Sequence, residues 1–124
     1  MRRPVRVTPR AVRGLGDDRG SVAAELAVAL PAALIAIALG VGALAAAATL
    51  GSLQDAAADS ARLLGRGESP ARAAAVVRDA VDGASSASRA AGELVCVTAS
   101  LDMRIGRIIA VPLSASSCAL AGGL

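Results

Sequence analysis

Few residues of this chain have a type and a setting that could support chemistry. The sequence contains no His to act as a general base, and its two cysteines, Cys96 and Cys118, lack C-x-x-C spacing. It also shows no metal-ligand cluster, no Gly-rich phosphate loop after a strand and no paired acids in an evident pocket. We therefore expect a protein that is not an enzyme and that holds no metal and no cofactor. The acid that stands out is Glu25, because of what surrounds it.

Glu25 stands at the head of a long uncharged stretch. The 25 residues of the range 26–50 carry no charge, and as a helix they would be about 37 Å long at ~1.5 Å per residue. A hydrocarbon core needs roughly 20 apolar residues, so we predict a transmembrane helix over residues 21–53. Pro31 lies inside it and removes one backbone hydrogen bond, which predicts a kink. Glu25 comes one residue too late for a capping box with Ser21, and one explanation is a side chain that simply reaches the membrane interface.

The positive charge of the chain is concentrated before this stretch. Residues 1–20 contain six arginines and two aspartates, a net charge of +4, whereas the rest of the chain has a net charge of −1. A basic arm of this kind can bind nucleic acid. Basic residues just ahead of a hydrophobic helix also hold that end in the cytoplasm, and we favour this interpretation because the two features are adjacent. Residues 1–20 are thus predicted as a basic cytoplasmic leader, unstructured up to Arg19, and no nucleic acid is expected as a partner.

After the span, helical spacing continues. Acids and then arginines recur at steps of four, three and four residues on one helix face, with apolar and small residues opposite, which predicts a helical stalk over 54–67. The charged positions are Asp55, Asp59, Arg62 and Arg66, and the opposite ones are Leu53, Ala57, Ser60 and Leu64.

The last part of the chain, residues 68–124, reads as a small extracytoplasmic domain. Ser69 and Pro70 suit the N-cap and first turn of a helix over 70–82, with Ala74, Val77 and Val81 as its buried stripe. Two β-branched segments then predict a hairpin. Its strands are 93–99 and 105–111, its turn lies around Asp102, Pro112 ends it, and a loop over 84–92 precedes it. The predicted fold class is α+β: a long N-terminal transmembrane helix extended into a stalk, then a small helix plus β-hairpin domain.

The two cysteines lie in this last part. An N-terminus held in the cytoplasm places everything after the single span on the outer side, where disulfides persist. Cys96 lies in the first predicted strand and Cys118 in a short tail beyond Pro112. We predict an intramolecular disulfide between them that pins the tail to the hairpin. The alternatives are that each cysteine is a small buried apolar residue, or that the pair links different subunits.

The head of the span resembles a known family. Gly20, four residues and then Glu25 at the start of a hydrophobic helix look like the type IV prepilin processing site, and the run RGSVAAELAVALP is similar to the TadE-like pilins of tight-adherence (Flp-type) systems. Downstream, QDAAADSARLLGRGE, LVCVTAS and SCALAGG resemble short actinobacterial TadE-family minor pilins. The resemblance implies that a prepilin peptidase cleaves between Gly20 and Ser21 and removes the leader. It departs from many prepilins at Leu26, where those have an aromatic residue.

The resemblance also implies a role for Glu25. Cleavage would create a free α-amine at Ser21, and an ammonium and a carboxylate in an apolar zone relieve each other's desolvation. In pilins this pairing runs between neighbouring subunits and sets their axial register. The expected partners are the prepilin peptidase, other pilin subunits, the pilus assembly platform and the membrane. The expected location is the cell membrane, single-pass with the C-terminus outside, and the pilus.

Two other classes of protein remain open at this point. Residues 1 to about 47 could be an ordinary signal peptide of a small secreted domain, with Ala45-Ala46-Ala47 as an A-x-A cleavage site. The apolar run is longer than the roughly 7–15 residues of a signal-peptide core. A plain single-pass anchored protein is the third option. A mature N-terminus at Ser21, Ala48 or Met1 distinguishes the three.

Overall fold

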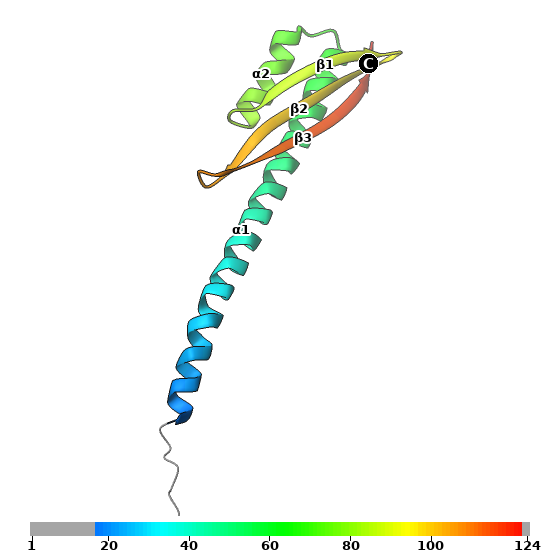
Figure 1. Cartoon of the computed structure of the whole chain (residues 1–124). Helices are drawn as coiled ribbons and strands as arrows, with labels where there is room; N and C mark the ends of the chain where they lie inside the picture. The colour runs from blue at the N-terminus through cyan, green and yellow to red at the C-terminus, as the bar shows by residue number, and fades with distance from the viewer. Residues whose placement is uncertain (1–16, 123–124) are drawn as a thin grey trace, which may run out of the picture. The chain divides into compact units, whose positions relative to one another are not determined.

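The computed structural model describes residues 17–122, which form two helices and three strands (Figure 1). These are α1 (Asp17–Gly65), α2 (Pro70–Ala80), β1 (Ser85–Ala91), β2 (Leu94–Ile105) and β3 (Ile109–Leu120). The chain divides into two compact units, Met1–Ala38 and Leu39–Leu124. In the first unit the described residues belong to α1 alone. The second unit contains the rest of α1 and all other elements.

Helix α1 begins earlier than the sequence suggested. Most of the predicted leader lies outside the described residues, but Asp17–Gly20 are helical, so the prediction of an unstructured chain up to Arg19 is wrong at its end. No proline interrupts the chain between Asp17 and Pro31, and one glycine inside a helix costs only about 1 kcal/mol. The helix also continues through Pro31 and through Gly51. A bend at Pro31 stays a prediction.

Helix α2 starts where the sequence predicted. The Ser69 side chain accepts a hydrogen bond from the Arg72 backbone N–H at 3.3 Å, and Pro70 occupies the first turn. The predicted buried stripe is shifted by one residue at its start, because Ala73 rather than Ala74 is buried beside Val77. The position of α2 is further tied to α1, since the buried Ser60 hydroxyl donates to the Ala73 carbonyl at 2.8 Å.

The strands form one antiparallel sheet in the order β1-β2-β3 (Figure 1). The predicted two-stranded hairpin is therefore incomplete, because the segment expected as a loop over 84–92 contains β1, which pairs with β2 from Ser85↔Ser100 to Ala91↔Leu94. The second correction concerns the turn between β2 and β3. It follows Ile105, with Gly106 at φ +66°, and Asp102 lies within β2 opposite Pro112.

Pro112 lies inside β3, where the sequence analysis expected the strand to end. β3 is an edge strand, and prolines are tolerated on edges when their nitrogen faces away from the neighbouring strand. The Ala121 N–H bonds the Glu93 carbonyl, so odd-numbered residues of β3 exchange hydrogen bonds with β2. Pro112 falls at an even position, in a pair that exchanges none. Its missing N–H thus breaks no bond of the ladder.

The core lies between one face of the sheet and the two helices. It is built from small and aliphatic residues of every element except β1: Leu53, Ala56, Ala57, Val77, Val81, Ala84, Ala99 and Ala115, with Leu101 and Leu113 packed against them. The range 54–67, expected as a stalk, is therefore mostly a core helix of the folded unit. The coarse fold prediction is confirmed, namely a long apolar helix followed by a small α+β arrangement.

Candidate functional site

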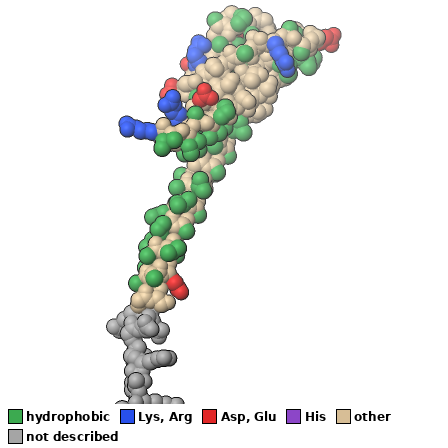
Figure 2. Space-filling model, in the orientation of Figure 1, with side chains coloured by type: hydrophobic (Ala, Val, Ile, Leu, Met, Phe, Trp, Pro, Cys, Tyr) green, Lys and Arg blue, Asp and Glu red, His purple; other side chains and the backbone are tan. Residues whose placement is uncertain are grey.

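The N-terminal half of α1 is covered with exposed apolar side chains. They lie on all sides of the helix, as neighbours such as Leu34 and Ile35 show, because successive residues point about 100° apart. Ten of them are more than half exposed: Val22, Leu26, Val28, Leu30, Leu34, Ile35, Ile37, Leu39, Val41 and Leu44. Figure 2 shows this green surface along the helix. The helix Gly20–Gly65 is long and apolar enough to cross a membrane, a property that signal sequences share.

Burial of such a surface is energetically large. Each Val, Leu or Ile side chain moved from water to an apolar environment contributes roughly 1.5–3 kcal/mol. A helix that is apolar all round belongs in a membrane or in the interior of an assembly. No part of this helix's apolar window is buried within the protein itself. The surface therefore needs a lipid or protein environment that a single copy in water does not provide.

Gly20, Ser21 and Glu25 all lie within α1 and are exposed. Ser21 and Glu25 are four residues apart, so they share one face of the helix with one turn between them. Among the side chains of residues 20–122 the ion pairs are Asp59–Arg62 at 3.0 Å and Glu68–Arg72 at 3.9 Å, and neither involves Glu25. The structure thus leaves Glu25 on an apolar surface without a described countercharge.

The charged face predicted beyond the span is solvated. Asp59 and Arg62 pair with side chains about two-thirds exposed, and exposed pairs of this kind contribute little to stability. The opposite face carries Leu53, Ala57 and Ser60, all buried, with Leu64 half-buried. The predicted division of this helix into two faces is therefore correct.

Cys96 and Cys118 form a disulfide, with a sulfur–sulfur distance of 2.02 Å. They are direct partners in the β2–β3 register, and their Cα atoms are 4.0 Å apart. Cys118 lies within β3, not in a tail as the sequence analysis expected. Even-numbered residues of β2 and β3 point away from the core, so the bond crosses the outer face of the sheet. It locks the register of these two strands.

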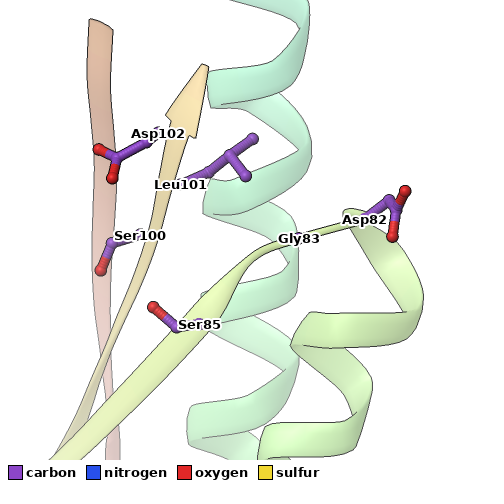
Figure 3. A pocket seen from close by; sticks show the side chains of 6 residues that line it. All are labelled: Asp82, Gly83, Ser85, Ser100, Leu101 and Asp102. Carbon is purple, nitrogen blue, oxygen red and sulfur yellow. The ribbon is translucent and has the colours of Figure 1, made fainter. Parts of the chain in front are cut away.

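A hollow of about 400 Å³ lies at the start of β1 and is lined by Asp82, Gly83, Ser85, Ser100, Leu101 and Asp102. Figure 3 shows Ser85, Ser100 and Asp102 on one side, whereas Leu101 points toward α1 and Asp82 is turned away from Asp102. The two carboxylates do not converge, and no group of three or more metal-ligating side chains occurs among the side chains described, those of residues 20–122. The hollow offers no arrangement for catalysis or cation binding.

One exposed feature was missed by the sequence analysis. The turn between β2 and β3 carries Ile108, which is 95% exposed, and Ile109, which is 57% exposed. Arg104 and Arg107 flank them. The signal in the sequence was the run RIGRII, in which a glycine sits among alternating basic and aliphatic residues. Because the turn was expected around Asp102, this run was assigned to a strand.

Comparison of the chain with protein-family models, curated proteins and solved structures found no match. Its function therefore has to be inferred from the geometry of α1, the disulfide and the sheet.

Proposed function

We propose that this protein is a structural subunit of a tight-adherence type IV pilus, a TadE-like minor pilin. In this proposal a prepilin peptidase cleaves between Gly20 and Ser21, and the mature subunit is held in the membrane and assembled through α1. The observation that carries the proposal is the apolar surface of α1, exposed on all sides and interrupted only by Glu25, one turn after Ser21. Such a surface serves both a membrane and a bundle of like helices.

Two further observations support the proposed topology, with the N-terminus in the cytoplasm and the folded unit outside. The arginines precede the span, which is the arrangement that retains an N-terminus inside. The disulfide between Cys96 and Cys118 belongs to the part of the chain that this topology places outside, where oxidising conditions preserve such bonds.

The proposal gives Glu25 a role in assembly, whereas a secreted domain gives it none and in a simple anchor its side chain only reaches the membrane interface. A carboxylate inside an insertion-competent helix costs up to about 2.5–3.5 kcal/mol. A free Ser21 amine on a neighbouring subunit would offset this cost by pairing with the carboxylate. A residue that is unfavourable in the isolated helix then becomes favourable in the assembled one.

The mature N-terminus tests the processing step. Mass spectrometry of protein isolated from the membrane is expected to find Ser21 as the first residue, and Gly20→Leu is expected to leave the uncleaved precursor in the membrane. Gly51→Leu, a change of the same kind farther along α1, serves as the control and should be processed normally. A first residue at Ala48 or Met1 in the natural protein, or normal cleavage of Gly20→Leu, would reject the proposal.

A further inference from the structure

The turn between β2 and β3 contains residue types that are unusual for a turn exposed to water. Its Ile108 side chain is 95% exposed. Gly106 at φ +66° makes the reversal tight, so the residues after it project outward. Turns in water favour Gly, Asn, Asp and Ser for conformational and hydrogen-bonding reasons. Ile108 and Ile109 are adjacent. Their exposure to water is unfavourable unless an apolar environment covers them.

The same turn carries positive charge. Arg104 and Arg107 line a shallow hollow of about 190 Å³ together with Ile108, Ile109 and Ala110. No acidic residue follows Asp102 in the chain. The ion pairs formed by the side chains of residues 20–122 include neither arginine. Figure 2 shows basic and apolar side chains gathered at the tip of this hairpin.

The position of the tip along α1 is set by two contacts. The Gln54 side chain donates to the Ser116 carbonyl at 3.4 Å, and the Gly122 N–H donates to the Gly65 carbonyl at 2.8 Å. The end of α1 and the end of β3 therefore run in the same direction. Going back from Ser116 to Ile109 covers about 23 Å of strand. Leu39, about 15 residues back along the helix from Gln54, is the limit for a parallel strand, and the oblique crossing in Figure 1 places the tip between that limit and Gln54.

The burial of the helix agrees with this placement. Between residues 41 and 50 the reduced exposure is confined to Gly42, Ala46 and Thr49, on the same face as Leu53. That face thus continues toward the hairpin. Figure 1 shows β2 and β3 crossing α1 obliquely, with the turn between them to one side of the helix.

The predicted transmembrane helix covers residues 21–53, and roughly 20 residues are enough to cross the hydrocarbon core, so the outer boundary falls between about Gly40 and Leu53. This stretch of α1 leads up to Gln54, where the hairpin contacts the helix. Arginine binds phosphate through paired N–H donors, and aliphatic side chains enter the boundary between headgroups and acyl chains. We propose that the tip of the β2–β3 hairpin, residues 104–110, is a second membrane contact that docks on anionic lipid headgroups. This inference rests on the membrane span of the proposed function.

In the docked state Arg104 and Arg107 bind lipid phosphates while Ile108 and Ile109 enter the interface. A basic residue near an anionic surface contributes about fivefold to the equilibrium, so two contribute about thirtyfold. Docking fixes the folded unit against the membrane before assembly. It is weakened by salt, because part of the attraction is screened.

The test uses the full chain reconstituted in vesicles, with an environment-sensitive fluorophore on a cysteine introduced at Ala110. Labelling under non-reducing conditions keeps the natural disulfide closed. Lipids that carry quenchers at the headgroup are expected to quench the probe in vesicles containing phosphatidylglycerol, and far less in phosphatidylcholine alone. The double substitution Arg104→Gln and Arg107→Gln should lower the docked-to-undocked ratio about thirtyfold, and Ile108→Ser should lower it as well. Since Ile108 is 95% exposed, its replacement does not disturb the core.

Two control positions separate this inference from the proposed function. A probe at Glu93, in the turn at the opposite end of β2, should stay unquenched in both lipids. A probe at Leu34 should be quenched from the acyl chains, which reports the span alone. Quenching at Leu34 without quenching at Ala110 overturns the inference and leaves the span intact, and no quenching at Leu34 overturns both. If the probe at Ala110 becomes shielded from water as the protein density in the vesicles rises, to the same extent in anionic and neutral lipids, the tip contacts a second copy of the protein. That result also overturns the inference.

Discussion

Glu25 and Ser21 lie one turn apart on α1, and the pairing proposed for them depends on chain cleavage and on a neighbouring subunit. Ser21 and Glu25 are i, i+4 neighbours within one helix, and the surface beyond them is uncharged as far as Asp55. Between subunits, the carboxylate of one helix can meet the amine of the next. A single residue then encodes the axial offset between copies.

The substitution Glu25→Val is expected to be inserted and cleaved but excluded from filaments. An unpaired ammonium left in an apolar site costs about 3–5 kcal/mol, so incorporation should fall on the order of 100-fold or more. The measurement compares the mature protein in sheared filaments with that in the membrane. Glu25→Asp keeps the charge and should retain part of the incorporation. Equal incorporation of the Val variant contradicts the proposed role of the carboxylate.

Gly65 matters for a different reason, the close approach of two backbones. A Cβ atom there would lie 2.6 Å from the Leu120 carbonyl oxygen, whereas a Cβ at Gly51 would meet nothing within 4 Å. Gly65→Ala should therefore lower the free energy of unfolding by about 1–3 kcal/mol, as overpacking does. Gly51→Ala, in the same helix, should be neutral or raise it by up to about 1 kcal/mol. Denaturant unfolding of the full chain in detergent, monitored by circular dichroism, measures both, and a neutral Gly65→Ala would show that the two backbones can separate at little cost.

At the scale of the elements, what the sequence could predict depended on how strongly each segment was patterned. The uncharged run of α1 and the Ser69-Pro70 start of α2 carry strong local signals, and both were predicted. The strand β1, with sequence SSASRAA, has neither alternation nor β-branched residues. It is a strand because β2 offers it a partner along its whole length. A tertiary pairing of this kind leaves no trace in the segment itself.

One buried hydroxyl adds a hydrogen bond to the packing of α1 against α2. Ser60 is 1% exposed and donates to the Ala73 carbonyl at 2.8 Å. Ser60→Ala should cost about 0.5–1.5 kcal/mol of stability, the usual net value of such a bond. Ser52, exposed and bonded only within its own helix at 3.3 Å, provides the matched control, and Ser52→Ala should be neutral. Thermal unfolding of the two variants measures the difference. Equal stabilities of Ser60→Ala and Ser52→Ala would show that the Ser60 hydrogen bond does not stabilise the packing of the helices.

At the scale of the whole molecule, the predicted division of the chain was too simple. A stalk over 54–67 was separated from a domain over 68–124, yet Leu53, Ala57 and Ser60 are buried in the same core as Val77 and Ala99. The small sheet has too little apolar area to be stable alone, since units of this size bury only about 60% of their unfolded surface. It uses the end of α1 as its second layer. The sequence predicted a helix with one charged and one apolar face. It did not predict that the sheet covers the apolar face.

The same shortage of core makes the disulfide important for the folded unit. Cys96 and Cys118 are separated by 22 residues, and closing a loop of about this length contributes about 3 kcal/mol through the entropy of the unfolded chain. Cys118 is exposed on the outer face of the sheet, so a reductant in solution can reach the bond.

Replacing both cysteines by Ala avoids a polar group at Cys96, which is buried at 4% exposure. The free energy of unfolding of the double variant is expected to be about 3 kcal/mol lower than that of the natural protein. Reductant should lower the stability of the natural protein to the same level and leave the double variant unchanged. Thiol titration under native conditions should find no free cysteine. Two free thiols in the folded protein, or equal stability with and without reductant, would show that the register of β2 and β3 does not need the disulfide.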